Sequence, residues 1–338
     1  MGNRPPAQKW TCGNCGVFNL GQKICGLGLG QREPEGYGCC VGLKEFTDRG
    51  VTRNYSLTMG DAESRQVEIP KTVTTRIPHG RVPLTKIKLG LECPNELSDE
   101  VLPLGDFNFA LAKEVLKSDR LVQYYKSSKK ICYLDNSTNE ELKPCSIQEL
   151  KKAAYLIQPD LVVSPDFLGD SQRTLDILPE ATDAFGKGGL LPVVQGNSLE
   201  NVLRCAKGIW ESSFSSIAVP YDTIVGRSAP IGDMARVRSL VVRSLAEMGF
   251  SRIHLLGLTS LEELIYYWFD PHTRQCIESL DTGGPVLLGL RKYRYPTELS
   301  YKTTPTLKLM NAVDSESRYT DEQRSLVFWN IAFLRTLL

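Results

Sequence analysis

The chain of 338 residues is 41% apolar and 23% charged, a composition typical of a soluble globular protein, and it is long enough for one large barrel or two modest domains. Forty Lys and Arg against 39 Asp and Glu give a formal net charge of +1, which excludes binding to nucleic acid or membrane through a global field. No apolar run could span a bilayer and the first ten residues lack a signal-peptide core, so we expect a cytoplasmic protein.

Residues 1–48 form a cysteine-rich segment that differs in composition from the rest of the chain. Half of the ten cysteines lie there, and Cys12-Gly-Asn-Cys15 is a C-x-x-C knuckle. Four thiolates suit tetrahedral zinc, and a segment this small needs such a ligand in place of a hydrophobic core. We predict a structural zinc site, with an iron–sulfur cluster or unligated cysteines as the alternatives. The predicted ligands are Cys12, Cys15, Cys25 and Cys39, with Cys40 as the alternative to Cys39.

Residues 49–80 are polar and poorly periodic, which indicates a linker with an irregular hairpin, whereas residues 81–338 show regular elements. The first of these are a predicted strand over residues 84–91 and a predicted helix over 108–116. Short apolar strands then alternate with amphipathic helices. The strands are predicted at 131–134, 161–163, 191–194, 217–219, 253–256 and 277–280, and the helices include 147–157, 199–210 and 234–248.

This alternation predicts parallel strands with helices outside them. The number of units favours an α/β fold of the (β/α)8 TIM-barrel type, and an open doubly wound sheet is the alternative. In such a barrel, groups at the C-terminal ends of the strands meet at one mouth. The polar and glycine residues at these ends are Asp135, Asp166, Gln195, Gly196, Asp222, Gly257 and Asp281.

Asp281 is the candidate reactive group, because it ends a buried strand and precedes a threonine and two glycines. An Asp before glycines is also a common turn, and Asp-Thr-Gly also marks aspartic proteases, but those need a β-rich chain. Carboxylates attack or stabilise an oxocarbenium-like sugar carbon, and carboxylate and amide groups match the edge of a purine. Histidine is scarce, and His254 lies in the middle of a strand, where a packing role is expected.

The order of these segments resembles the tRNA-guanine transglycosylases and, more closely, their phage relatives that insert 7-deazaguanine derivatives into DNA, the DpdA-type transglycosylases. The resemblance covers residues 76 to 290. It is carried by LDNST with Asp135, LVVSPD with Asp166, PVVQG with Gln195 and Gly196, HLLGLTSLEEL with Leu256, and the strand that ends at Asp281.

The resemblance implies that Asp281 attacks C1′ of a guanine nucleoside, and that a 7-deazapurine such as preQ0 captures the covalent glycosyl–enzyme. Asp135 would act as the general acid/base. No redox or nucleotide cofactor is needed, accessory DNA-modification proteins are compatible partners, and the location would be the host cytoplasm if a phage encodes the chain. The expected base-binding residues are Asp166, Gln195, Gly196, Asp222, Leu256 and Gly257.

Three departures from the tRNA enzymes favour the DNA-modifying branch. Pro220-Tyr221 stands in place of a Gly-Gly pair, TGGP follows Asp281 in place of a Pro-Thr-Arg run, and no cysteine follows Cys276 where the tRNA enzymes carry a zinc site. We therefore expect a DNA guanine transglycosylase. The alternatives are a tRNA-guanine transglycosylase, its accessory subunit, and a non-catalytic zinc-bearing nucleic-acid-binding protein; an Asp at position 281 argues against the accessory subunit.

Contacts to the nucleic-acid backbone would come from local basic and aromatic residues, with the target nucleotide flipped or single-stranded. The segment soon after Asp281 provides Arg291, Lys292, Tyr293 and Arg294. A second basic set, which a solvated helix face would also explain, consists of Arg236, Arg238 and Arg243 on the predicted helix 234–248.

Overall fold

The computed structural model describes residues 86–138, 142–224, 231–258, 260–295 and 319–338, together with two short strands nearer the N-terminus. The chain divides into two units, residues 1–83 and 84–338. In the first unit, β1 (Phe18–Asn19) and β2 (Ile24–Cys25) pair antiparallel. The rest of the predicted cysteine-rich segment and the predicted linker lie outside the described residues.

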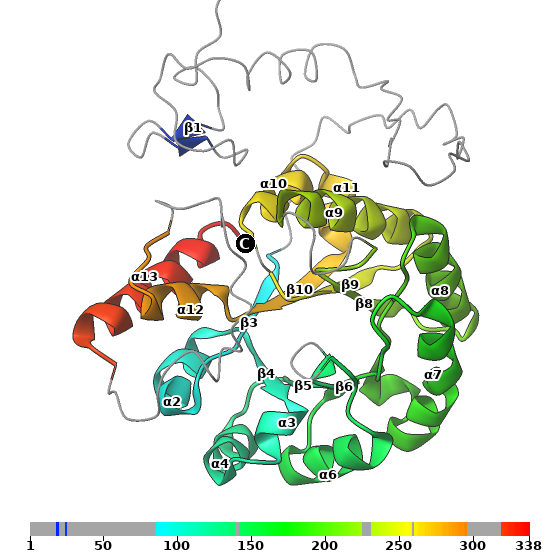
Figure 1. Cartoon of the computed structure of the whole chain (residues 1–338), viewed down its shortest axis with the longest axis horizontal. Helices are drawn as coiled ribbons and strands as arrows, with labels where there is room; N and C mark the ends of the chain where they lie inside the picture. Colours follow the sequence, from blue (N-terminus) through cyan, green and yellow to red (C-terminus); the bar gives the residue numbers. More distant parts are fainter. Residues whose placement is uncertain are drawn as a thin grey trace, which may run out of the picture. The chain divides into compact units, whose positions relative to one another are not determined.

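The second unit is built around eight parallel strands that follow one another around a nearly closed barrel (Figure 1). Strands pair in chain order from β3 to β7 and from β8 to β10, and β10 pairs with β3. Residues just after β7 bridge the last gap, because Val194 N–H donates to Ala218 O (3.0 Å) and Ala218 N–H donates to Pro192 O (2.7 Å). The strands are β3 (Lys88–Leu91), β4 (Phe107–Leu111), β5 (Cys132–Asp135), β6 (Leu161–Val163), β7 (Leu190–Leu191), β8 (Ser216–Pro220), β9 (Arg252–Leu256) and β10 (Ile277–Thr282).

This sequential strand order differs from that of an open doubly wound sheet, in which the order reverses at a switch point. The prediction of a parallel α/β barrel is therefore confirmed, and its architecture is TIM-like. In such a barrel every strand leads out at the same end, so the residues that follow the strands can share one site.

Helices surround the strands (Figure 1). Their starts follow the expected capping chemistry, as in α6, where the Ser146 side chain accepts from Glu149 N–H and the Glu149 carboxylate accepts from Ser146 N–H. The apolar positions of α6 recur at helical spacing and are buried against the sheet. The α-helices are α2 (Ser98–Val101), α3 (Ala112–Val115), α4 (Asp119–Ser127), α6 (Ile147–Ile157), α7 (Ser171–Phe185), α8 (Leu199–Glu211), α9 (Ile231–Glu247), α10 (Glu262–Trp268), α11 (Pro271–Cys276), α12 (Gly284–Leu290) and α13 (Asp321–Arg335).

The predicted helix over residues 108–116 is wrong in its first half. Residues Phe107–Leu111 form strand β4, and only Ala112–Val115 are helical. The reason is the alternation of aromatic residues in this segment, because Phe107 and Phe109 both point into the barrel while Ala110 packs in the outer core. A period of two with aromatic side chains is typical of a strand.

The interior of the barrel is filled by a cluster of large side chains at the level of these strands. It contains Phe107, Phe109 and Tyr133 together with smaller residues from β6 to β8. The imidazole of His254 lies among the three rings and stacks on Phe109 with ring centroids 5.7 Å apart. The barrel is therefore a packed core below its mouth and not a pore.

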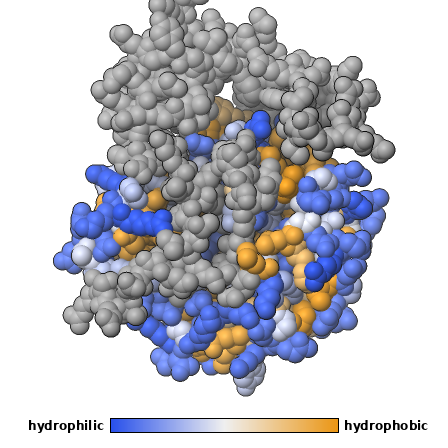
Figure 2. All heavy atoms as spheres, in the orientation of Figure 1, coloured by the Kyte–Doolittle hydropathy of each residue, from blue (hydrophilic) through white to orange (hydrophobic). Residues whose placement is uncertain are grey.

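Polar and charged side chains make up much of the visible surface of the barrel unit, with hydrophobic patches between them (Figure 2). Among the described residues, Tyr155, Trp210 and Tyr266 are large hydrophobic side chains that stay exposed. No helix in the described part of the chain is both long and apolar enough to cross a membrane.

Candidate active site

A pocket opens at the C-terminal ends of the barrel strands. Its empty volume, counted with the open mouth, is about 490 Å³, within the range of small-molecule sites. Five carboxylates and two side-chain amides line it, and Phe109 of the packed interior contributes to its wall. The lining residues are Glu92, Phe109, Leu111, Asp135, Asn136, Thr138, Asp166, Leu168, Gln195, Pro220, Tyr221, Asp222, Leu256, Gly257 and Asp281.

The residues predicted at the strand ends meet in this pocket with one exception. Asp135 is the last residue of β5, and Asp281 is the last but one of β10. The others lie at or just after the ends of β6 to β9. Gly196 is the exception, because it packs against α8: a Cβ at this position would stand 2.6 Å from Val202 N. The glycine of the PVVQG segment thus allows close approach of a helix, and its predicted contact with a base stays a prediction.

The Asp281 carboxylate is almost fully buried and is held through one of its oxygens. Its Oδ1 accepts from Gly257 N–H (3.0 Å) and lies 3.1 Å from His254 Nε2. A carboxylate only accepts, so Nε2 carries the hydrogen, and Nδ1 of the same ring lies 2.8 Å from Ser279 Oγ. Oδ2 makes no hydrogen bond to any described residue. This arrangement leaves one carboxylate oxygen for a ligand in the pocket.

Asp166 is the centre of a second buried network. Its carboxylate accepts from Gln195 Nε2 (2.5 Å), Asn136 Nδ2 (2.8 Å) and Thr138 Oγ1 (2.9 Å). Burial raises the pKa of Asp166 above its ordinary value and the nearby charge of Asp222 adds to the rise, although these three hydrogen bonds act in the opposite direction. The protonation of the Asp166 carboxylate therefore depends on its burial, on Asp222 and on these hydrogen bonds.

Asp135 is held by the backbone that follows it. Its Oδ2 accepts from Ser137 N–H (2.7 Å), and Ser137 adopts a left-handed conformation with φ of 57°. The next residue of the LDNST segment, Asn136, donates its amide N–H to Asp166 Oδ1. One short segment thus positions a carboxylate at the pocket wall and supports the neighbouring carboxylate network.

Gly257 and Tyr221 approach each other closely across the pocket edge. Gly257 has a φ of +68°, and a Cβ there would stand 3.0 Å from Tyr221 Cδ1. Both the left-handed backbone and the contact therefore require glycine. Tyr221 follows β8, so the ends of β8 and β9 are fitted together at the place where Gly257 reaches Asp281.

Sequence reasoning missed several lining residues. Glu92 directly follows β3 and donates its N–H to Thr282 O (3.2 Å), and the same strand-end rule that selected Asp281 would have found it. Asn136 lies within the LDNST segment, but the sequence alone assigns it no role. His254 gave no usable signal, because only the register between β9 and β10 places its ring beside Asp281.

The predicted nucleic-acid-binding residues lie between α12 and α13. Lys292 forms an ion pair with Glu322 (2.8 Å), the Arg294 guanidinium stacks 3.7 Å over the Trp329 ring, and Tyr293 is 44% exposed. Neither these residues nor Arg291 line the pocket. Their contact with nucleic acid stays a prediction.

Arg238 corrects the expectation of a basic helix face. Its side chain is completely buried and paired with Glu263, so it cannot meet a phosphate group on the surface. The helical spacing that suggested a solvated basic row on α9 does not distinguish the outer face from the face that packs on the barrel.

The predicted metal ligands fall outside what the structure describes in side-chain detail. Cys12, Cys15 and Cys39 lie outside the described residues, and of Cys25 only the backbone in β2 is described. Within the described part, no group of three or more His, Cys, Asp or Glu side chains is arranged to hold a metal ion. The zinc site stays a prediction.

The chain matches no model of a known protein family and no curated protein sequence.

Proposed function

We propose that the protein is a transglycosylase that exchanges guanine in DNA for a 7-deazaguanine base. One observation supports this proposal above the others. Asp135, Asp166, Gln195 and Asp281 are separated by up to 146 positions in the chain (281 − 135), yet all four line one pocket at the strand ends. Two of them suit the reaction at the sugar and two suit the edge of a purine.

In the first step, Asp281 Oδ2 attacks C1′ of the target nucleoside. The C1′–O bond forms while the C1′–N9 bond breaks, and the bonding electrons leave with guanine. Asp135, as the general acid, supplies the proton that lets guanine leave as a neutral base. The sugar passes through an oxocarbenium-like state that a buried carboxylate stabilises.

In the second step, the incoming 7-deazapurine reverses these events. Its N9 gives its proton to Asp135 and attacks C1′, and the ester bond to Asp281 breaks. The nucleophile and the acid are regenerated with no change in oxidation state. The proposed steps balance without a redox or nucleotide cofactor.

Asp166 and Gln195 would recognise the base. A guanine edge offers two N–H donors beside the O6 acceptor, so an ionised carboxylate next to an amide is complementary to it. In the empty pocket the Gln195 amide donates to Asp166, while its Oε1 accepts from Gly169 N–H (3.1 Å). Rotation of this amide towards O6 would release an acceptor site on Asp166 for the base.

The polymer would enter with its target nucleotide flipped or single-stranded, since a base stacked in a duplex does not reach the mouth of a barrel. The exposed Tyr293 and the neighbouring cations between α12 and α13 are our candidates for stacking and phosphate contacts. The pairing of Lys292 with Glu322 is exposed and weak, so a phosphate could replace the carboxylate.

The decisive experiment offers the protein radiolabelled guanine or preQ0 with either DNA or unmodified tRNA. We expect label to enter DNA, and to enter single-stranded DNA faster than a stable duplex. Label that enters only tRNA would assign the protein to the tRNA enzymes. If neither polymer takes up label while the protein still binds nucleic acid, the proposal is wrong and a non-catalytic binding protein remains.

The affinity for the free base should fall at acidic pH. Asp166 can accept from the base only when it is ionised, and burial raises its pKa, so protonation sets in at a higher pH than for an ordinary aspartate. Below this raised pKa we expect KM for the base to rise about tenfold for each pH unit. A KM–pH profile measures this rise, and the Asp166→Asn variant should show a high KM with no such slope. A KM that stays flat into the acid range would contradict the role of Asp166.

We also propose that the cysteine-rich segment holds structural zinc. The full-length protein should then contain about one zinc per chain by elemental analysis, as a single four-thiolate site requires. The Cys12→Ser/Cys15→Ser variant should lose this metal, whereas Cys205→Ser, at a buried free cysteine of α8, should keep it. Equal metal content in the two variants would contradict the predicted zinc site. Bound iron in place of zinc would indicate an iron–sulfur cluster.

A further inference from the structure

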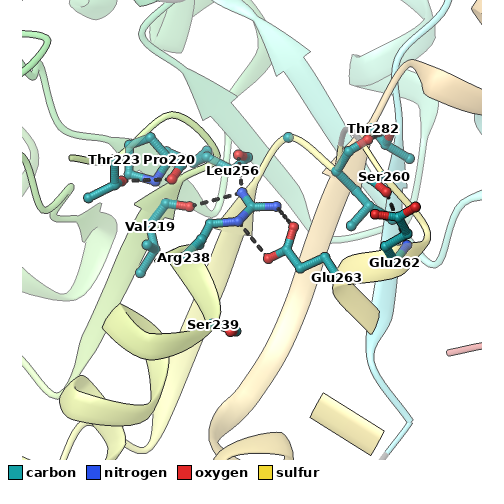
Figure 3. Close-up of polar contacts among 12 residues, drawn as sticks. Val219, Pro220, Thr223, Arg238, Ser239, Leu256, Ser260, Glu262, Glu263 and Thr282 are labelled. Carbon is teal, nitrogen blue, oxygen red and sulfur yellow. Dashed lines mark hydrogen bonds and ion pairs between the residues drawn. The ribbon is translucent and has the colours of Figure 1, made fainter. Parts of the chain in front are cut away.

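A fully buried ion pair lies behind the ends of β8 and β9. Arg238 of α9 meets Glu263 of α10 through two of its nitrogens, with Nε 2.6 Å from Oε1 and Nη2 in contact with Oε2 (Figure 3). Neither side chain is more than 1% exposed. Tyr267 completes the group, because its hydroxyl donates to Glu263 Oε1 (2.6 Å). Burial lowers the pKa of Arg238, but the charge and hydrogen bonds of Glu263 outweigh it, so the guanidinium stays charged.

Stability alone does not explain this pair. The cost of removing two charges from water often exceeds their mutual attraction, and apolar residues of similar volume are frequently as stable or more so. Unlike an apolar side chain, the guanidinium can orient backbone groups by hydrogen bonds. Its third nitrogen, Nη1, donates to Leu256 O (2.8 Å) and lies 3.4 Å from Val219 O, and these carbonyls belong to the C-terminal ends of adjacent strands (Figure 3).

The carbonyl of Leu256 belongs to the same peptide unit as the N–H of Gly257. That N–H donates to Asp281 Oδ1, the oxygen that also meets His254. A peptide unit is planar, and in its trans form the C=O and N–H point in opposite directions. A guanidinium that holds the carbonyl on one side therefore aims the N–H at the carboxylate on the other.

The Leu256–Gly257 peptide needs a fixed partner because glycine supplies its N–H side. Gly257 has a φ of +68°, and glycine adopts many backbone conformations at similar cost, so the Leu256–Gly257 peptide could rotate easily. Rotation would break the bond to Arg238 and the bond to Asp281 together. The positive charge beside the carbonyl also polarises the peptide and strengthens its N–H as a donor.

We propose that the buried Arg238–Glu263 pair is a positioning device, which orients the Leu256–Gly257 peptide so that its N–H fixes Oδ1 of Asp281 and leaves Oδ2 facing the pocket. Glu263 and Tyr267 fix the guanidinium, the guanidinium fixes the peptide, and the peptide fixes the carboxylate. The consequence for catalysis rests on the proposed transglycosylase function. The link from Arg238 to Asp281 does not, and it can be tested separately.

The link itself is tested by NMR on the full-length protein. Labelling with carbonyl-13C leucine and 15N glycine selects Leu–Gly peptides, and the Leu256–Gly257 signal is the one lost in the Gly257→Ala variant. In the wild type this amide proton should resonate downfield and move upfield in Asp281→Asn. The apolar variant Arg238→Met/Glu263→Met/Tyr267→Phe, which leaves no unpaired buried charge, should show the same upfield shift. A wild-type shift in the apolar variant overturns the inference.

The catalytic consequence is tested by base-exchange kinetics of the same apolar variant. We expect kcat to fall on the order of 10²-fold, the loss typical of a misplaced reacting group. Val241→Ala, which removes buried apolar volume from the same helix and leaves Arg238 and Glu263 in place, is the matched control and should keep wild-type kcat even though it lowers the melting temperature. If the apolar variant does not fold, Arg238→Lys replaces it in both the NMR and the kinetic test. Lysine keeps the positive charge but lacks the several guanidinium nitrogens that bond Glu263 and Leu256 O together.

The outcomes separate the two ideas. Absence of exchange in the wild type refutes the proposed function, while the Gly257 amide shift still decides the positioning role. Exchange in the wild type with an undiminished kcat in the apolar variant refutes the positioning role alone. An equal loss of kcat in Val241→Ala also refutes it, because the effect would then follow from stability.

Discussion

Replacement of Asp281 by asparagine is expected to abolish base exchange while the fold and the binding of nucleic acid persist. Asparagine has nearly the same shape, and its carbonyl oxygen can still accept from Gly257 N–H, so the pocket should stay intact. It lacks the anionic oxygen that attacks C1′. Loss of a covalent nucleophile costs on the order of 10⁴-fold or more in kcat, so the residual exchange should fall below detection.

The measurement is incorporation of labelled base into DNA, together with a denaturing gel for the covalent intermediate. Wild-type protein incubated with DNA and no free base should give a slowly migrating protein–DNA adduct, and the Asp281→Asn variant should give none. Asp160→Asn is the matched control, because it makes the same chemical change at a residue that supports Cys132 N–H and does not line the pocket. Exchange at the wild-type rate in Asp281→Asn would refute the nucleophile and the proposed mechanism with it.

Much of this site was predictable because a parallel barrel converts sequence order into spatial convergence. Each buried strand is short and apolar, so its end is visible in the sequence, and every end lies at the same mouth. Asp135, Gln195 and Asp281 could therefore be selected without any knowledge of the distances between them. Glu92 obeyed the same rule after β3 and could have been selected as well.

The remaining features depend on contacts between residues that are remote in the chain. The segment 108–116 contains apolar residues at spacings that fit both a helix and a strand, and the pairing of β4 with β3 and β5 adds to the aromatic alternation in selecting the strand. Arg238 lies in a regular amphipathic pattern, but its burial depends on Glu263 reaching it from another helix. Long-range partners of this kind leave no periodic signal along a single sequence.

His254 is the most informative of these unpredicted residues, because its ring joins the packed interior to the reactive carboxylate. Three aromatic rings surround it, and its Nε2 meets Asp281 Oδ1 while its Nδ1 meets Ser279. A packing role alone would be served by phenylalanine at this position. A role in orienting Asp281 requires the N–H, since Oδ1 has only Gly257 as its other donor among the described residues.

The His254→Phe variant separates these two roles. Phenylalanine preserves the aromatic packing but removes the donor, so the melting temperature should change little while kcat falls roughly 10²–10³-fold, the loss typical of one preorganised donor at a reacting group. Phe107→Leu is the matched control, because it alters another ring that packs on the imidazole but takes no part in the hydrogen bonds to Asp281 and does not line the pocket. His254→Gln, which restores an N–H donor, should recover part of the lost kcat. Wild-type kcat in His254→Phe would show that the imidazole only fills space and that the Gly257 N–H alone orients the carboxylate.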